Sequence, residues 1–193
     1  MRMDERYYLL KIQLLEIEPA IWRRFVVPSN ISLDRLHDVI QIVMGWTDSH
    51  LHEFTIGKKR YTEYPESKED GLIDGMYRLG DLIKQKGRSF QYWYDFGDDW
   101  MHEVILEDNK YFNPHQRSQV VCLDGSRACP PDDVGGPYGY GEYLEAMKDP
   151  NHEEHTMYIE WRGPDFDSET FDLGFINFQL DTFLRWSRER YKS

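Results

Sequence analysis

Residues 92–102 are Tyr92-Trp93-Tyr94-Asp95-Phe96-Gly97-Asp98-Asp99-Trp100-Met101-His102. Large aromatic rings, aspartates and a histidine surround a single glycine in this segment. Rings of this size are costly to expose, so much of the segment must be buried. Acidic groups among buried rings must be hydrogen-bonded, ion-paired or metal-bound. We therefore expect two strands, residues 89–95 and 100–107, whose connection lies either in the core or at the edge of a site.

The N-terminal part of the chain predicts a second hairpin. Residues 7–18 alternate with the period of a strand, and one face carries Tyr8, Leu10, Ile12 and Leu14. The pattern resumes in residues 21–27, where one side carries Ile21, Arg23, Phe25 and Val27. Because Pro19 interrupts the alternation, we expect two antiparallel strands closed near this residue.

A helix is predicted after this hairpin. Helical spacing is followed by Leu33, Leu36, Val39, Ile40 and Val43. Ser32 suits the N-cap position and Gly45 suits the first position beyond the C-terminal cap.

Shorter elements are predicted in the rest of the chain. We expect strands at 51–56, 60–64 and 119–123, and helices at 78–86, 143–148, 151–161 and 172–190. The last helix has Phe175, Phe178, Phe183 and Trp186 at helical spacing. Residues 65–75 and 109–116 are expected to be loops, and the Pro- and Gly-rich residues 128–141 to be irregular. Since no βαβ alternation dominates, the sequence predicts a single α+β domain over residues 1–193, with a mostly antiparallel sheet of about five to seven strands packed by helices.

Composition limits the classes of function. The 193-residue chain carries 35 acidic and 23 basic side chains, for a net charge of −12. Such a charge repels phosphate backbones, so nucleic-acid binding is disfavoured except at a local basic patch. We expect no membrane association, because no apolar stretch reaches the length of about 18 residues that a span requires. With two cysteines and no basic, apolar leader, the sequence predicts a cytoplasmic protein with reduced thiols.

One candidate site is a metal centre. His50 and His52 are two positions apart, so on a strand their side chains project to one face, and His102 can add a third nitrogen from another strand. Zn²⁺ favours three or four N, S or O ligands. Completing ligands are available from Cys129, Asp95, Asp98 and Asp99. The alternative is that His50 and His52 hydrogen-bond loop backbone at the sheet edge.

A second candidate is the basic pair Arg23-Arg24 beside Trp22. Arginine stacked on an aromatic ring can bind a phosphate or a nucleobase. With Lys58-Lys59-Arg60 the pair would form a basic strip along one edge. The alternative, which the net charge favours, is that one arginine pairs internally with an acid such as Asp95 or Asp98 while the other is solvated.

A third candidate is Cys129, which precedes Pro130 and Pro131. A thiol held by a rigid loop is nucleophilic if its pKa is depressed, and His102 or His52 would then serve as its base. The alternative, which we favour, is a rigid loop folded against the sheet with Cys129 as a small buried hydrophobe.

Four segments together resemble the plasmid Ri open-reading-frame-three-like (ORF-3-like) family. They are Ile17-Glu18-Pro19-Ala20-Ile21-Trp22-Arg23-Arg24, His50-Leu51-His52-Glu53-Phe54, residues 94–102, and Ala128-Cys129-Pro130-Pro131-Asp132-Asp133-Val134-Gly135-Gly136. They occur in the family's order between about residues 7 and 177. The resemblance implies one α+β domain, an association with plasmids and other mobile elements, and no established enzymatic activity. Val134 stands where the family often has a cysteine, which weakens the idea of a cysteine-pair metal site.

We expect the four segments to gather at one end of the sheet and to line one concave patch. The leading hypothesis is a non-enzymatic binding or accessory module, associated with mobile elements, that engages a protein or small ligand and needs no cofactor. Its binding residues would be Trp22, Arg23, Arg24, Tyr94, Asp95, Asp98, Trp100, Pro130, Pro131, Gly135 and Gly136. One alternative is a metal-dependent hydrolase or nuclease with Zn or Mn held by His50, His52 and His102, aided by Asp98 or Asp99. Another alternative is a DNA-associated accessory protein.

Overall fold

The predicted N-terminal hairpin is present in the computed structural model, which describes residues 6–67, 69–114 and 119–190, with side chains described as far as residue 182. Strands β1 (Tyr7–Leu14) and β2 (Trp22–Pro28) pair antiparallel, with Ile12 opposite Arg23. Burial alternates along β1 as the sequence pattern predicts. The hairpin therefore presents one apolar face to the core.

Eight strands form one sheet in the order β5-β4-β3-β6-β7-β1-β2-β8. The other six strands are β3 (His52–Ile56), β4 (Lys59–Thr62), β5 (Leu72–Ile73), β6 (Ser89–Tyr94), β7 (Trp100–Tyr111) and β8 (Val121–Ser126). Every neighbouring pair is antiparallel except β4 and β5, which are parallel. The mostly antiparallel α+β class is confirmed. The strand number exceeds the prediction, because β5 occurs inside the expected loop 65–75.

One other boundary differs from the prediction. Strand β7 continues to Tyr111 because it pairs along its length with β1, where Tyr7 lies opposite Tyr111. That pairing extends the strand into the expected loop 109–116, of which residues 115 and 116 lie outside the described residues.

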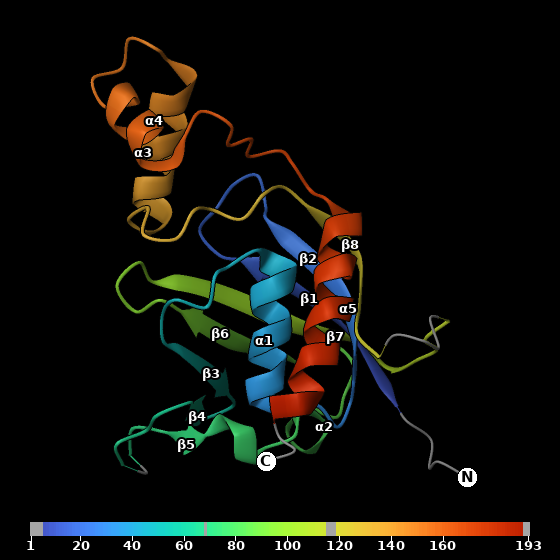
Figure 1. Ribbon diagram of the computed structural model, residues 1–193. Coiled ribbons are helices and arrows are strands. Elements are labelled where there is room, and N and C mark those ends of the chain that lie inside the picture. Colours follow the sequence, from blue (N-terminus) through green and yellow to red (C-terminus); the bar gives the residue numbers. More distant parts are fainter. Residues whose placement is uncertain (1–5, 68, 115–118, 191–193) are drawn as a thin grey trace.

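Helices α1 (Leu33–Met44) and α5 (Leu173–Arg190) lie side by side across one face of the sheet (Figure 1). The shorter helices are η1 (Asp74–Met76), α2 (Leu79–Leu82), α3 (Gly136–Lys148) and α4 (His155–Arg162). Figure 1 shows α3 and α4 beyond one end of the sheet. No helix in the described ranges is both long and apolar enough to cross a membrane.

Helix α1 begins and ends where the sequence predicts. Gly45 follows it in the left-handed conformation, and its backbone N–H donates to the carbonyl of Gln41. Ser32 occupies the N-cap position, but its side chain makes no capping hydrogen bond.

The expectation that residues 128–141 are irregular is wrong for the second half of that segment, because α3 begins at Gly136. Proline in the first turn of a helix needs no N–H partner, so Pro137 fits there. Gly139 is required by packing, since a Cβ at that position would overlap the carbonyl of Val134. These glycines and this proline lie in the first turns of a helix. Because glycine and proline are also typical of loops, their composition alone suggests a loop.

Helix α5 faces the sheet with residues other than its phenylalanines. Phe175 and Phe178 are 56% and 67% exposed, whereas Ile176 and Leu180 are buried. The side chains of Phe183 and Trp186 lie outside the described residues. The α5 residue Asn177 binds both backbone groups of Cys122 in β8, at 2.9 Å each, which fixes the helix against the sheet edge.

Candidate functional site

Three segments distant in sequence meet at one end of the sheet. His50 lies two residues before the start of β3, Asp95 begins the turn between β6 and β7, and Asp133 lies in the loop before α3. His50 Nε2 lies 3.3 Å from Asp133 Oδ1 and 3.5 Å from Asp95 Oδ2. Three of the four segments that resemble the family thus converge.

The turn after β6 is ordered by Asp95. Its Oδ1 accepts hydrogen bonds from the backbone amides of Gly97 and Asp98, at 3.0 and 3.3 Å. Its Oδ2 is left facing His50. A buried carboxylate held by backbone N–H groups is positioned by the turn itself, so the orientation of Asp95 does not depend on a ligand.

The loop that precedes α3, residues 128–135, is held against this end of the sheet at two places. Asp98 Oδ2 accepts the backbone N–H of Gly135 at 3.0 Å. Thr47, after α1, donates its N–H and its hydroxyl to Asp132 Oδ2 at 3.2 and 2.5 Å. A Cβ on Gly136 would overlap the Asp98 carbonyl, so the loop approaches the turn as closely as glycine permits. Asp133 is therefore held between two fixed neighbours.

Left-handed backbone conformations are concentrated around this site. Among the described non-glycine residues, six have a positive φ angle, and four of these are aspartates on or beside the segments that meet here: Asp48, Asp95, Asp99 and Asp133. The other two are Glu16 and Arg127. Aspartate tolerates this region better than most residues, but each such position still carries strain. Strain of this kind often accompanies functional sites.

An apolar pocket of about 350 Å³ lies beside Asp133. Its other lining residues are Val134, Gly135, Met157, Tyr158 and Trp161. Met157 and Trp161 are 49% and 43% exposed, although they are large apolar side chains. We call the group His50, Asp95, Asp133, Val134, Gly135, Met157, Tyr158 and Trp161 the acidic–aromatic site.

The three predicted metal-binding histidines do not share one centre. His52 Nε2 bonds to the buried Asp74 at 2.8 Å, and its ring stacks on His37 at 3.6 Å. His102 has both nitrogens occupied, one by the Tyr92 carbonyl at 3.2 Å and the other by the Trp46 indole N–H at 3.3 Å. Burial lowers the pKa of His102 to about 4. Within the described ranges, His50 instead groups with Asp95 and Asp133.

Residues 23 and 24 project to opposite faces of β2, so they form no common basic strip. Arg23 is buried and donates to five backbone carbonyls, including those of Val43 and Met44 at the end of α1. Arg24 pairs with Glu107 at 2.6 Å and lies over Trp22. One arginine thus pairs with an acid as expected, but the acid is Glu107 and not Asp95 or Asp98. The expectation that the other arginine is solvated is wrong, because Arg23 is buried.

Other predicted binding residues are internal. Burial is nearly complete for Tyr94, Trp100, Pro130, Pro131 and Gly136. The Tyr94 hydroxyl accepts the Ser49 N–H at 3.2 Å, and burial raises the pKa of this tyrosine. These residues are therefore interior and offer no surface to a partner. Asp95, Asp98 and the exposed Gly135 are the predicted residues that lie at the site.

The nucleophilic reading of Cys129 is not supported. Burial raises the pKa of its thiol well above the usual value, which outweighs the opposing effect of nearby Arg23. The thiolate that nucleophilic attack requires is therefore disfavoured.

The sequence interpretation missed Met157, Tyr158 and Trp161. The available signal was the spacing of Met157 and Trp161, four apart in a helix otherwise rich in polar residues, which places both on one face. Asp133 lies in a segment already singled out, but alternation and spacing do not reveal that it faces His50.

Comparison with known proteins agrees with this architecture. The family model described as plasmid pRiA4b ORF-3-like protein matches residues 6–174. The uncharacterised protein y4hQ of Sinorhizobium fredii is 40% identical over 184 residues, which cover 93% of this chain and 94% of that protein. The crystal structure of MM3350 from Methanosarcina mazei, a protein of unknown function, is 36% identical and superimposes with a TM-score of 0.78 over 89% of this chain and 97% of that chain.

Proposed function

We infer that this protein, which belongs to the plasmid pRiA4b ORF-3-like family, is a non-enzymatic binding module that engages a cationic side chain of a partner protein at the acidic–aromatic site. The observation that carries the proposal is the position of Asp133, which lines the pocket formed with Met157, Tyr158 and Trp161. Asp95 lies behind it, on the other side of His50. The proposal includes a cytoplasmic location and an accessory role in mobile elements, the latter on the family's plasmid name.

The chemistry of the pocket favours an arginine or lysine. Carboxylates bind a guanidinium or ammonium group, and aromatic faces attract the same cations. The net charge of −12 adds a long-range attraction for a basic partner. Half-exposed aromatic residues are also typical of protein interfaces.

A labelled arginine peptide tests this proposal by fluorescence anisotropy. We expect millimolar binding to the native protein, because one side chain in a small pocket gives only about 4 kcal/mol. Asp133→Asn should weaken binding about fivefold or more, whereas Asp165→Asn, with the same change of charge on an exposed loop, should not. Equal effects of the two variants would mean that the peptide senses only net charge.

A second candidate, a divalent metal centre, is favoured by one observation. The Nε2 atom of His50 is buried between two carboxylates, yet it makes no hydrogen bond within the part of the chain that the structure describes. His50, Asp95 and Asp133 offer the mixed nitrogen and oxygen ligands that Zn or Mn accept, and a bound metal would open the way to hydrolase or nuclease chemistry.

Metal content distinguishes the two candidates. Mass spectrometry of tag-free protein, purified without added metal or chelator, should find near-stoichiometric Zn or Mn if the centre exists. His50→Gln should then abolish it, while His155→Gln, a change at a histidine bonded to the Ala146 carbonyl, should leave it intact. Trace metal in all three proteins would remove the metal candidate.

A further inference from the structure

We propose that a second pocket, at the opposite end of the sheet, binds a small organic anion that has a carboxylate or phosphate head and an apolar body. Strand β3 begins at His52 beside the acidic–aromatic site and ends at Ile56 in this second pocket. The cavity measures about 620 Å³, within the usual range for small-molecule sites. We call it the basic pocket, and it is independent of the proposed function above.

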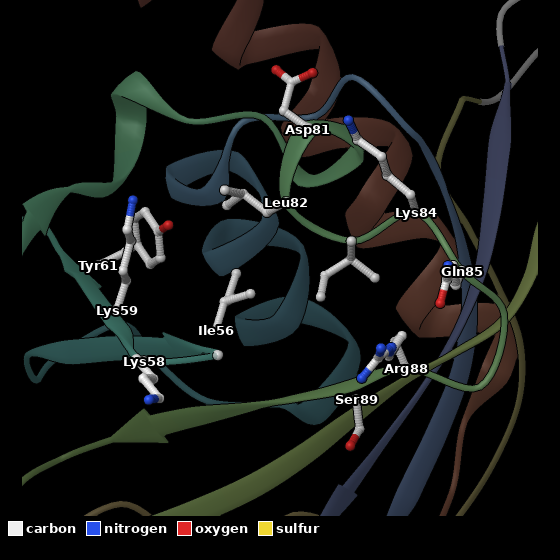
Figure 2. A pocket seen from close by; sticks show the side chains of 12 residues that line it. Ile56, Lys58, Lys59, Tyr61, Asp81, Leu82, Lys84, Gln85, Arg88 and Ser89 are labelled. Atoms are coloured by element: carbon white, nitrogen blue, oxygen red, sulfur yellow. The ribbon is translucent and has the colours of Figure 1, made fainter.

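Charge distinguishes the basic pocket from the rest of the molecule. Its lining residues include four cationic side chains and one acidic side chain, in a protein whose net charge is −12. The charged residues are Lys58, Lys59, Lys84, Arg88 and Asp81. Figure 2 shows Lys59, Lys84 and Arg88 arranged around Ile56 and Leu82 in this view.

These four cations have no carboxylate partner among the residues that the structure describes. Other arginines in the same part of the chain do form ion pairs. Arg24, Arg60 and Arg127 each lie within 4.0 Å of an acidic side chain, at 2.6, 3.5 and 2.9 Å. The four cations of the basic pocket make no such pair. Grouped like charges repel one another, so an anion placed among them relieves that repulsion.

The base of the basic pocket is apolar. Ile56 and Ile83 are 8% and 7% exposed, and Leu82 is half-buried. An inorganic anion would leave this apolar surface exposed to water. An anion with a hydrocarbon portion would cover the surface, and the burial of apolar area would add to its binding free energy. The combination of charged rim and apolar base therefore selects an amphipathic anion.

The backbone around the basic pocket is fixed. The Ile83 carbonyl accepts the hydroxyl of buried Tyr8 at 2.9 Å. The Arg88 carbonyl accepts the N–H of Leu106 at 2.9 Å, and Gly87 donates to the Leu106 carbonyl at 2.8 Å. Because the side chains at the rim are carried by an ordered backbone, ligand binding costs less conformational entropy than it would at a mobile loop.

Isothermal titration calorimetry with four probes tests the proposal. Decanoate and decyl phosphate should bind, inorganic phosphate should bind at least about tenfold more weakly, and decyltrimethylammonium should not bind. The stronger of the two decyl anions identifies the head group. Binding of the ammonium probe as tightly as the anions would overturn the proposal.

Matched variants locate the binding. Lys59→Gln with Arg88→Gln should weaken the better decyl anion about tenfold. Lys86→Gln with Lys110→Gln makes the same charge change at exposed residues outside the pocket and should leave affinity within about twofold. Leu82→Gln should weaken the decyl anion but not inorganic phosphate.

Two outcomes would contradict a small-molecule site. One is an equal loss of affinity in the two double variants, which would indicate a general effect of charge. The other is binding to phosphatidylserine vesicles without binding to either monomeric decyl anion, which would indicate a surface contact with a membrane. Asp133→Asn should not alter the affinity of the basic pocket for the anion. A failure of the anion proposal would therefore not count against the proposed function of the acidic–aromatic site.

Discussion

The backbone N–H of Gly135 donates a hydrogen bond to Asp98 Oδ2 across 3.0 Å, which joins residues 37 positions apart. This contact holds the loop before α3 against the turn between β6 and β7. Because Asp133 precedes Gly135 by two residues and Asp95 precedes Asp98 by three, the same contact brings their carboxylates to the two sides of His50.

Removing this acceptor should loosen the site and lower stability. Asp98→Ala leaves the Gly135 N–H without its carboxylate partner, and we expect a loss of about 1–2 kcal/mol in the free energy of unfolding. Urea denaturation measures the change. The exposed control Asp165→Ala should shift stability by less than about 0.5 kcal/mol. An Asp98→Ala protein as stable as this control would show that the contact does not hold the loop.

Two glycines in α3 should respond to alanine with opposite signs. Gly136 has a φ of +70° and no room for a Cβ beside the Asp98 carbonyl, so Gly136→Ala should cost about 2 kcal/mol or more. Gly141 lies in the same helix with open space around it, so Gly141→Ala should stabilise by about 0.5–1 kcal/mol. Thermal unfolding of both variants tests the difference. Similar melting temperatures would contradict the close approach of loop and turn.

Neighbouring arginines should differ in their tolerance of lysine. Arg23 uses its planar guanidinium to bind five carbonyls in a buried position, and lysine cannot reproduce that fork. We expect Arg23→Lys to destabilise the fold by about 2–4 kcal/mol, because buried carbonyls lose their donors. Arg24→Lys, at a partly exposed ion pair, should change stability by less than about 1 kcal/mol. Chemical denaturation of the two variants compares them directly, and equal effects would refute the structural role of Arg23.

Stability should fall in acid partly because of His102. Burial lowers the pKa of this histidine in the folded state to about 4, below the unfolded value of 6.5. Between these values the unfolded chain takes up the proton and the folded chain does not, so stability falls as the pH falls from about 6.5 to about 4. The difference of roughly 2.5 pH units corresponds to a loss of about 3 kcal/mol.

Replacing His102 isolates this contribution. In His102→Gln the fall in unfolding free energy between pH 6.5 and 4 should be smaller than in the native protein by a large part of that amount. Asp38, whose pKa burial raises to about 6 and which acts in the opposite sense, is present in both proteins and cancels. Parallel pH profiles would contradict a buried neutral His102.

Local periodicity accounts for what the sequence could predict. Alternation in residues 7–14 and 21–27 identified the buried faces of β1 and β2, including the inward position of Arg23. Four of the five carbonyls that Arg23 binds lie at the end of α1 or at and just after the end of β8, and no local pattern encodes such distant contacts. His52 likewise meets Asp74, which lies 22 residues away in η1.

Two features lie beyond what composition and spacing encode. Glycine and proline indicate where the backbone departs from regular geometry, but they do so both in loops and at the first turn of a helix, as at Gly136 and Pro137. The phenylalanines of α5 fit helical spacing, yet the face that packs is chosen by the sheet and not by the helix alone. The convergence of three of the four family-like segments agrees with the prediction that all four gather at one end of the sheet. Which of their side chains meet was not predictable.

Two-dimensional NMR of the native protein tests most directly whether a cation binds between Asp133 and the aromatic rings of α4. The two probes are a short arginine peptide and the same peptide with neutral citrulline in place of arginine. We predict chemical-shift changes centred on the Gly135 amide and the Trp161 indole N–H with the arginine peptide and not with its citrulline counterpart. Shifts spread over the acidic surface, or equal shifts with both peptides, would contradict cation binding at this position.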